Sequence, residues 1–95
     1  MYIDYQILSV VEDMTAAPQS NFNGMNCTPI ALGRYDTASK LLCISATKDN
    51  FPKVATGKKY NIVARRKDNQ ETDTFSGTYN TDWSFSIFQY KGEIV

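Results

Sequence analysis

The sequence contains no histidine and only five glycines, which stand singly. Without histidine, Cys-His and Ser-His-Asp nucleophile systems are excluded and the commonest metal ligand is missing. The isolated glycines form no phosphate-binding loop of the G-x-x-x-x-G-K-[ST] or G-x-G-x-x-G type. The carboxylates of Glu12-Asp13, or of Asp68, Glu71 and Asp73, are the remaining catalytic candidates, and such polar clusters are usually only solvated. We therefore expect a protein that is not an enzyme and uses no metal or cofactor.

Cysteine and long apolar runs are also scarce. Cys27 and Cys43 are too few for a disulfide framework and form no C-x-x-C pair, so both are predicted to be small buried strand residues. No apolar run approaches the ~20 residues that span a membrane, and the first residues lack the cationic and apolar blocks of a signal peptide. We expect one domain over residues 1–95, without membrane association, in the cytoplasm, or in the host cytoplasm if the protein is viral.

Strand signals dominate the rest of the chain. β-branched and aromatic residues recur in short runs that polar, glycine or proline residues interrupt about every ten positions. The predicted strands cover residues 2–11, 27–35, 40–47, 58–67, 73–79 and 82–91, with a long loop at 14–26 and at most one helical turn, at 52–56. The pattern predicts an all-β domain, a small antiparallel barrel of five or six strands.

Period-two alternation predicts which strand residues are buried. The apolar block in 40–47 buries either Leu42 and Ile44 or, in the other register, Leu41 and Cys43. The other predicted core residues are Tyr60, Ile62, Ala64, Phe75, Trp83, Phe85 and Ile87. Phe88 and Tyr90 then face outward from the last strand, and Gly77 marks a bulge or a close backbone approach.

Positive charge is absent from the first 33 residues and concentrated in the middle of the chain. Residues 34–67 hold nine of the ten cations and only two carboxylates, a net charge of +7, whereas residues 1–33 carry −3 and residues 68–95 carry −4. Such a segment is a candidate anion-binding surface if its cations, which include Lys40, fold onto one face.

Single-stranded nucleic acid is bound by cations that contact phosphates and by aromatic side chains on which bases stack. The candidate nucleic-acid-binding residues are Arg34, Tyr35, Lys48, Phe51, Lys53, Lys58, Lys59, Arg65, Arg66, Lys67, Phe88 and Tyr90. The triplet at 65–67 sends at least one arginine outward, and we expect these three side chains to be mostly solvated. Phe51 follows Asp49-Asn50 at an apparent loop tip, where burial is harder.

The order of elements also carries a resemblance. A hydrophobic third strand, a short link and the strand entry Gly57-Lys58-Lys59-Tyr60 resemble the small OB-fold single-stranded-DNA-binding proteins of bacteriophages, over about residues 27–67. The resemblance implies an OB-like barrel, a role in DNA replication and sequence-tolerant binding across the sheet and its loops. The acidic C-terminal tail of many bacterial members has no counterpart here, so recruitment of partners by a tail is not expected.

The preferred hypothesis is a non-catalytic protein that binds single-stranded DNA with little sequence preference. The alternative is a small β-rich protein-binding module or phage-type inhibitor, whose basic residues and surplus aromatics meet an acidic partner surface. Whether the chain forms a homodimer is left open.

Overall fold

A computed structural model of the protein describes residues 1–12 and 28–95, so the predicted loop at 14–26 and Cys27 lie outside the described residues. The described part is all-β and contains no helix, and residues 52–56 form no helical turn. The strands are β1 (Tyr2–Glu12), β2 (Ala31–Asp36), β3 (Leu41–Thr47), β4 (Lys59–Arg66), β5 (Thr72–Tyr79), β6 (Ser84–Tyr90) and β7 (Glu93–Ile94).

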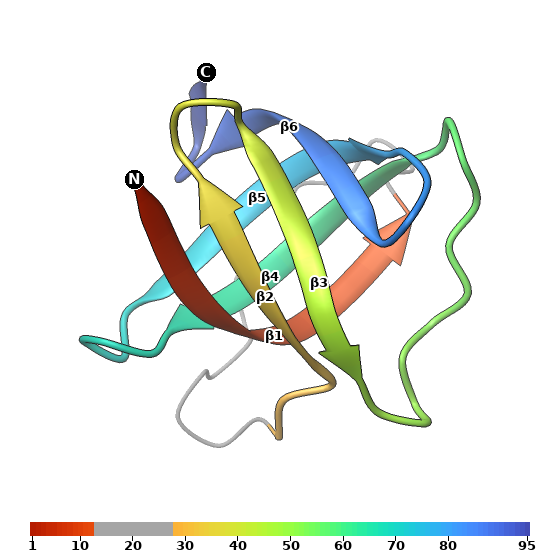
Figure 1. Cartoon of the computed structure of the whole chain (residues 1–95), viewed down its shortest axis with the longest axis horizontal. Helices are drawn as coiled ribbons and strands as arrows, with labels where there is room; N and C mark the ends of the chain where they lie inside the picture. Colours follow the sequence, from red (N-terminus) through yellow and green to blue (C-terminus); the bar gives the residue numbers. More distant parts are fainter. Residues whose placement is uncertain (13–27) are drawn as a thin grey trace.

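The strands form one antiparallel sheet that closes on itself (Figure 1). Its order is β3-β2-β1-β4-β5-β6-β7, and an additional pairing of β3 with β6 completes a six-stranded barrel that leaves β7 as an extra strand. Two three-stranded units, β1–β3 and β4–β6, are therefore joined by residues 48–58 and by the β1–β4 pairing. The predicted small OB-like antiparallel barrel is confirmed.

The core lies inside the barrel, where every second residue of each strand points. In β3, Leu42 and Ile44 are buried, so the first of the two predicted registers is correct. Leu41 is partly exposed, and the prediction that Cys43 is buried is wrong because it lies on the outward face of β3. Its thiol is a free, exposed group.

Strand β4 is buried on both sides, which simple alternation did not predict. Tyr60, Ile62 and Ala64 lie in the core as expected, but Asn61 and Val63 on the other face are buried as well. The side chain of Asn61 accepts a hydrogen bond of 2.7 Å from the hydroxyl of buried Ser76. This pairing compensates for the burial of two polar side chains.

A β-bulge changes the direction of side chains late in β6. Ser76 pairs with Gln89 and Gly77 with Ile87, so Phe88 is an extra residue between two paired positions. The predicted close approach at Gly77 is also confirmed, because a Cβ at this position would lie only 2.7 Å from Ser86 O and from Ile87 Cδ1 on β6. The bulge turns Tyr90 toward the barrel interior, and the prediction that Phe88 and Tyr90 share the outer face is therefore wrong.

The start of β2 and both ends of β6 differ from the predicted strand boundaries. β2 begins at Ala31, so residues 28–30 of the predicted strand, including Pro29, precede it. The predicted last strand, 82–91, is shorter at both ends, because Asp82, Trp83, Lys91 and Gly92 have positive φ angles that reverse the chain. The second reversal produces the short hairpin partner β7, which the sequence pattern did not indicate.

Candidate functional site

Three aromatic side chains meet at one end of the barrel. Residues 48–58 pass alongside the β5–β6 turn (Figure 1), and the amide of Gly57 donates a 2.9 Å hydrogen bond to Tyr79 O. Between them lies an open hollow of about 410 Å³, which we call the aromatic hollow; it is lined by Thr47, Lys48, Phe51, Pro52, Lys53, Val54, Tyr79 and Trp83.

Trp83 was predicted to lie in the core, and the structure shows that this is wrong. It belongs to the β5–β6 turn, with φ of 62° after a φ of 56° at Asp82, and its side chain is 45% exposed. Its carbonyl accepts a 2.7 Å hydrogen bond from the amide of Ile44, and its own amide donates a 3.1 Å hydrogen bond to the Tyr79 hydroxyl. The turn therefore fixes the tryptophan backbone outside the barrel.

Phe51 lies beside Trp83, as its loop position allows. The ring centroids are 5.5 Å apart at an interplanar angle of 66°, an edge-to-face contact. Phe51 is partly buried and also packs against the core, so it is less exposed than the predicted loop tip implied. The segment that carries it is anchored by the Ala55 amide, which donates to the Tyr60 hydroxyl at 2.8 Å.

Two predicted cations border the aromatic hollow. Lys48 and Lys53 are both exposed and line its wall. No carboxylate in residues 1–12 or 28–95 forms an ion pair with either ammonium group. Their charges are therefore available to an external anion.

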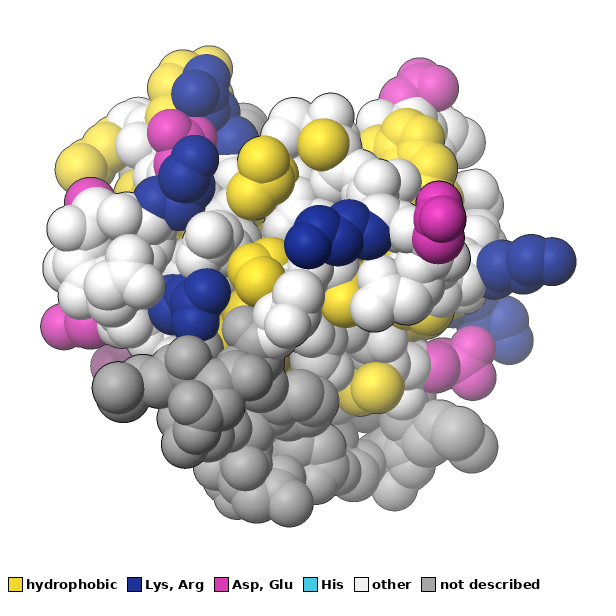
Figure 2. Space-filling model, turned by 90° about the horizontal axis from the view of Figure 1, so that it is seen from below, with side chains coloured by type: hydrophobic (Ala, Val, Ile, Leu, Met, Phe, Trp, Pro, Cys, Tyr) yellow, Lys and Arg dark blue, Asp and Glu magenta, His cyan; other side chains and the backbone are white. Residues whose placement is uncertain are grey.

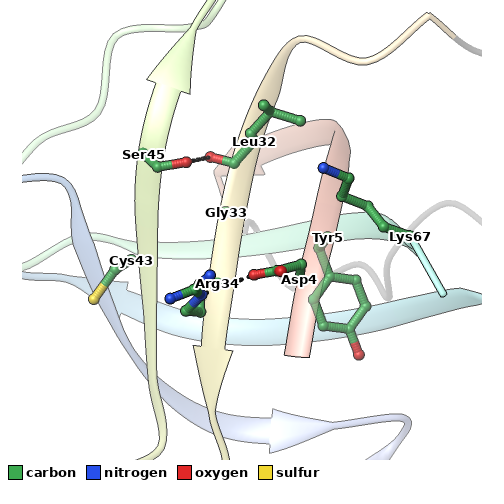
Figure 3. A pocket seen from close by; sticks show the side chains of 8 residues that line it. All are labelled: Asp4, Tyr5, Leu32, Gly33, Arg34, Cys43, Ser45 and Lys67. Carbon is green, nitrogen blue, oxygen red and sulfur yellow. Dashed lines mark hydrogen bonds and ion pairs between the residues drawn. The ribbon is translucent and has the colours of Figure 1, made fainter. Parts of the chain in front are cut away.

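A second open hollow of about 430 Å³ lies over the outer face of β1, β2 and β3 (Figure 3), and we call it the β2–β3 hollow. Arg34 Nε donates a 2.8 Å hydrogen bond to Asp4 Oδ1 across the strand pair. This bond, and the charges of Arg34 and Lys67, hold the pKa of Asp4 below its ordinary value. Its lining is Asp4, Tyr5, Leu32, Gly33, Arg34, Cys43, Ser45 and Lys67.

The two hollows have a neighbouring hollow in common along β2 and β3. A smaller hollow between them is lined by Pro29, Ala31, Leu32, Ala46, Thr47 and Lys48. Leu32 also lines the β2–β3 hollow, and Thr47 and Lys48 also line the aromatic hollow. Each neighbouring pair of hollows therefore shares lining residues, and we call the three together the depression.

The arginines of the 65–67 triplet are not mostly solvated, so that expectation is wrong. Arg65 donates to Gln6 Oε1 from Nε and Nη2 at 2.9 and 2.8 Å, and both side chains are partly buried. Arg66, also partly buried, forms a bidentate pair with Asp68 at 2.9 and 2.6 Å, which raises the pKa of Arg66. Lys67 alone is exposed.

Tyr35 and Tyr90 are removed from the candidate stacking residues. Tyr35 is 1% exposed, because it occupies an inward position of β2, and its ring lies 4.8 Å from that of Tyr90. The Tyr90 ring also packs 4.9 Å from Phe75, and its hydroxyl lies 2.6 Å from that of Tyr5. Both tyrosines are parts of the core packing.

The remaining candidates lie on other parts of the barrel. Lys59 Nζ is 5.7 Å from the ring centroid of partly buried Phe88, on the outside of β4–β6, and exposed Lys58 precedes β4. Lys40 lies in the β2–β3 turn, at the opposite end of β3 from Lys48. Figure 2 shows Lys and Arg side chains dispersed among uncharged and hydrophobic groups. The basic segment is therefore divided over the barrel rather than gathered on one face.

Sequence reasoning missed Trp83 and Tyr79 as site residues. The available signal was the polar run Asn80-Thr81-Asp82, which indicates a turn, but the alternation of Trp83 with Phe85 placed the tryptophan in the strand.

Comparisons of the chain with protein-family models, curated proteins and solved structures give no match. Within residues 1–12 and 28–95, no cluster of acidic and cysteine side chains could hold a metal ion, and no helix could cross a membrane.

Proposed function

We propose that this protein binds single-stranded DNA, without catalysis and with little sequence preference, through the depression that runs from the aromatic hollow to the β2–β3 hollow. The observation that supports this most is the aromatic hollow itself. It combines an exposed tryptophan, an adjacent phenylalanine and two lysines that have no carboxylate partner in the described part of the chain.

The aromatic hollow supplies the stacking contact. Trp83 keeps nearly half of its surface in solvent, while its edge-to-face contact with Phe51 restrains the ring. A base stacked on such a platform contributes about 1–3 kcal/mol and requires no particular base, since every base has a π-face. Lys48 and Lys53 would then contact the phosphates on either side of the stacked nucleotide.

The β2–β3 hollow supplies further phosphate contacts. The amide of Lys48 donates to Ile30 O, and Arg34 lies four residues beyond Ile30, about 13 Å at ~3.3 Å per residue. Arg34 uses Nε for Asp4, and a guanidinium carries five N–H donors, so others can reach a phosphate. Lys67 lies on the same hollow. An extended strand of several nucleotides would fit this arrangement.

The test is a titration with oligo-dT at two salt concentrations, followed by the emission of Trp83, the only tryptophan. We expect quenching, and a logarithmic salt slope of about −0.7 per phosphate contact. The double variant Lys48→Ala, Lys53→Ala should flatten the slope by about 1.4. Lys40→Ala is the control, because it removes another exposed lysine, which precedes β3 and lies about 26 Å from Lys48 along the strand at ~3.3 Å per residue.

A protein partner is the second candidate function. An exposed tryptophan beside a hollow is also the usual anchor of a protein interface, and Arg34 and Arg66 are already paired with carboxylates. If folded protein fails to bind oligo-dT at low salt, the DNA proposal is abandoned in favour of an acidic protein surface.

A further inference from the structure

We infer that the hydroxyl of Tyr79 is a positioning group that holds Trp83 ready to stack, an inference that rests on the proposed function. Tyr79 lines the aromatic hollow, but its ring is packed 5.1 Å from the fully buried ring of Phe85. It is therefore joined rigidly to the core, while its hydroxyl accepts the amide proton of Trp83 at 3.1 Å.

Trp83 needs such a restraint because of its backbone conformation. Asp82 and Trp83 are two consecutive non-glycine residues with left-handed φ angles of 56° and 62°. Residues with a β-carbon rarely adopt this conformation, and they keep it only where surrounding contacts enforce it. Such strained positions are concentrated at ligand-binding sites, and here the strained residue is the exposed aromatic of the proposed site.

The contacts that enforce the turn come from both of its sides. The Asn80 amide donates to Ser84 O at 2.8 Å, and the Ser84 hydroxyl donates to Thr81 O at 3.0 Å. These bonds close the turn but do not touch Trp83. The residue itself is held at its carbonyl by Ile44 and at its amide by Tyr79.

Restraint of Trp83 before binding has a functional consequence. A side chain that is already ordered loses less conformational entropy when a base stacks on it, so the same contact gives a higher affinity. Loss of the Tyr79 hydroxyl should therefore weaken binding although Tyr79 itself need not touch the DNA. The salt slope should not change, because no phosphate contact is lost.

The experiment compares Tyr79→Phe with Tyr60→Phe. Both tyrosines pack on Phe85, and each hydroxyl accepts a backbone amide proton, from Trp83 and from Ala55 respectively. The two variants thus delete the same kind of bond, but only one deletion is at Trp83. Circular dichroism checks folding, and the steady-state anisotropy of Trp83 is measured in the free protein.

In Tyr79→Phe we expect a lower Trp83 anisotropy in the free protein and an oligo-dT affinity reduced about 2- to 10-fold, the range for one neutral hydrogen bond. In Tyr60→Phe the anisotropy should fall less than in Tyr79→Phe, because both backbone hydrogen bonds of Trp83 remain and Tyr60 acts on Trp83 only through the segment that carries Phe51.

Unchanged anisotropy in Tyr79→Phe would overturn the inference, and so would lower anisotropy with unchanged affinity. A Tyr79→Phe chain that does not fold would overturn it as well, since the hydroxyl would then support the barrel rather than Trp83. If wild-type protein does not bind oligo-dT, the proposed function fails separately, and the anisotropy still decides whether Tyr79 holds Trp83.

Discussion

Replacement of Trp83 by alanine separates the stacking contribution from the electrostatic one. The variant removes the exposed ring but should keep the turn. Alanine and tryptophan both carry a β-carbon, so the left-handed φ at position 83 is no less favourable for alanine than for tryptophan. A stacked base contributes about 1–3 kcal/mol, which corresponds to an increase in Kd of about 5- to 150-fold. The logarithmic salt slope should remain at the wild-type value, since stacking releases no counterions.

The Trp83→Ala variant should lose only a small part of its free energy of unfolding. The ring is 45% exposed, and it packs edge to face against Phe51. An aromatic pair stabilises the folded state by about 0.5–1.5 kcal/mol beyond the effect of its buried area. For a domain of this size, each kcal/mol lost lowers Tm by roughly 4–8 °C. The variant should therefore remain folded at room temperature.

The assay is the fluorescence anisotropy of dye-labelled oligo-dT, because the variant has no tryptophan emission. Phe88→Ala serves as the comparison, since Phe88 lies with Lys59 on the outside of β4–β6 and outside the proposed depression. A loss of affinity below about twofold for Trp83→Ala, or an equal loss for Phe88→Ala, would refute the placement of the stacking contact.

Three further predictions concern the barrel. Gly77→Ala should reduce the unfolding free energy by about 1–3 kcal/mol in urea denaturation, because its Cβ would meet Ser86 O at 2.7 Å; a stability equal to wild type would contradict the bulge geometry. Leu42→Ala should cost about 2–5 kcal/mol and Cys43→Ala less than about 0.5 kcal/mol in the same assay, since only Leu42 points inward; equal costs would contradict the register. Burial and the Asp73 carboxylate raise the pKa of Tyr5 well above its ordinary value of 10.0. The protonated Tyr5 hydroxyl should contribute fully to the free energy of unfolding below about pH 10, and this contribution should be lost as the pH rises further. The absorbance of the Tyr5 tyrosinate should appear only when the protein unfolds.

The sequence by itself determined the features that depend on local geometry. A strand alternates with period two, so spacing alone placed Phe85 and Ile87 together in the core and narrowed the buried pair of β3 to two alternatives, of which the structure shows Leu42 with Ile44. Glycine tolerates positive φ and close contact, so Gly57, at φ 84°, marked a tight strand entry.

Tertiary structure decided what depends on how the strands meet. The bulge opposite Ser76 and Gly77 follows from the pairing of β5 with β6, and it turned Tyr90 into the core against the simple alternation. The β3–β6 pairing and the return of residues 48–58 to the barrel brought Phe51 to Trp83. Neither contact is encoded by spacing along the chain.

The charge pattern shows the difference most directly. Nine cations lie within residues 34–67, yet successive strands of a closed barrel occupy different sides of it, and alternate residues of a strand point in opposite directions. Arg66 is consequently paired with Asp68, Arg34 with Asp4, and Lys48 reaches the aromatic hollow without a carboxylate partner among the described residues. The number of charges follows from the sequence alone, whereas barrel closure decided which of them could act together.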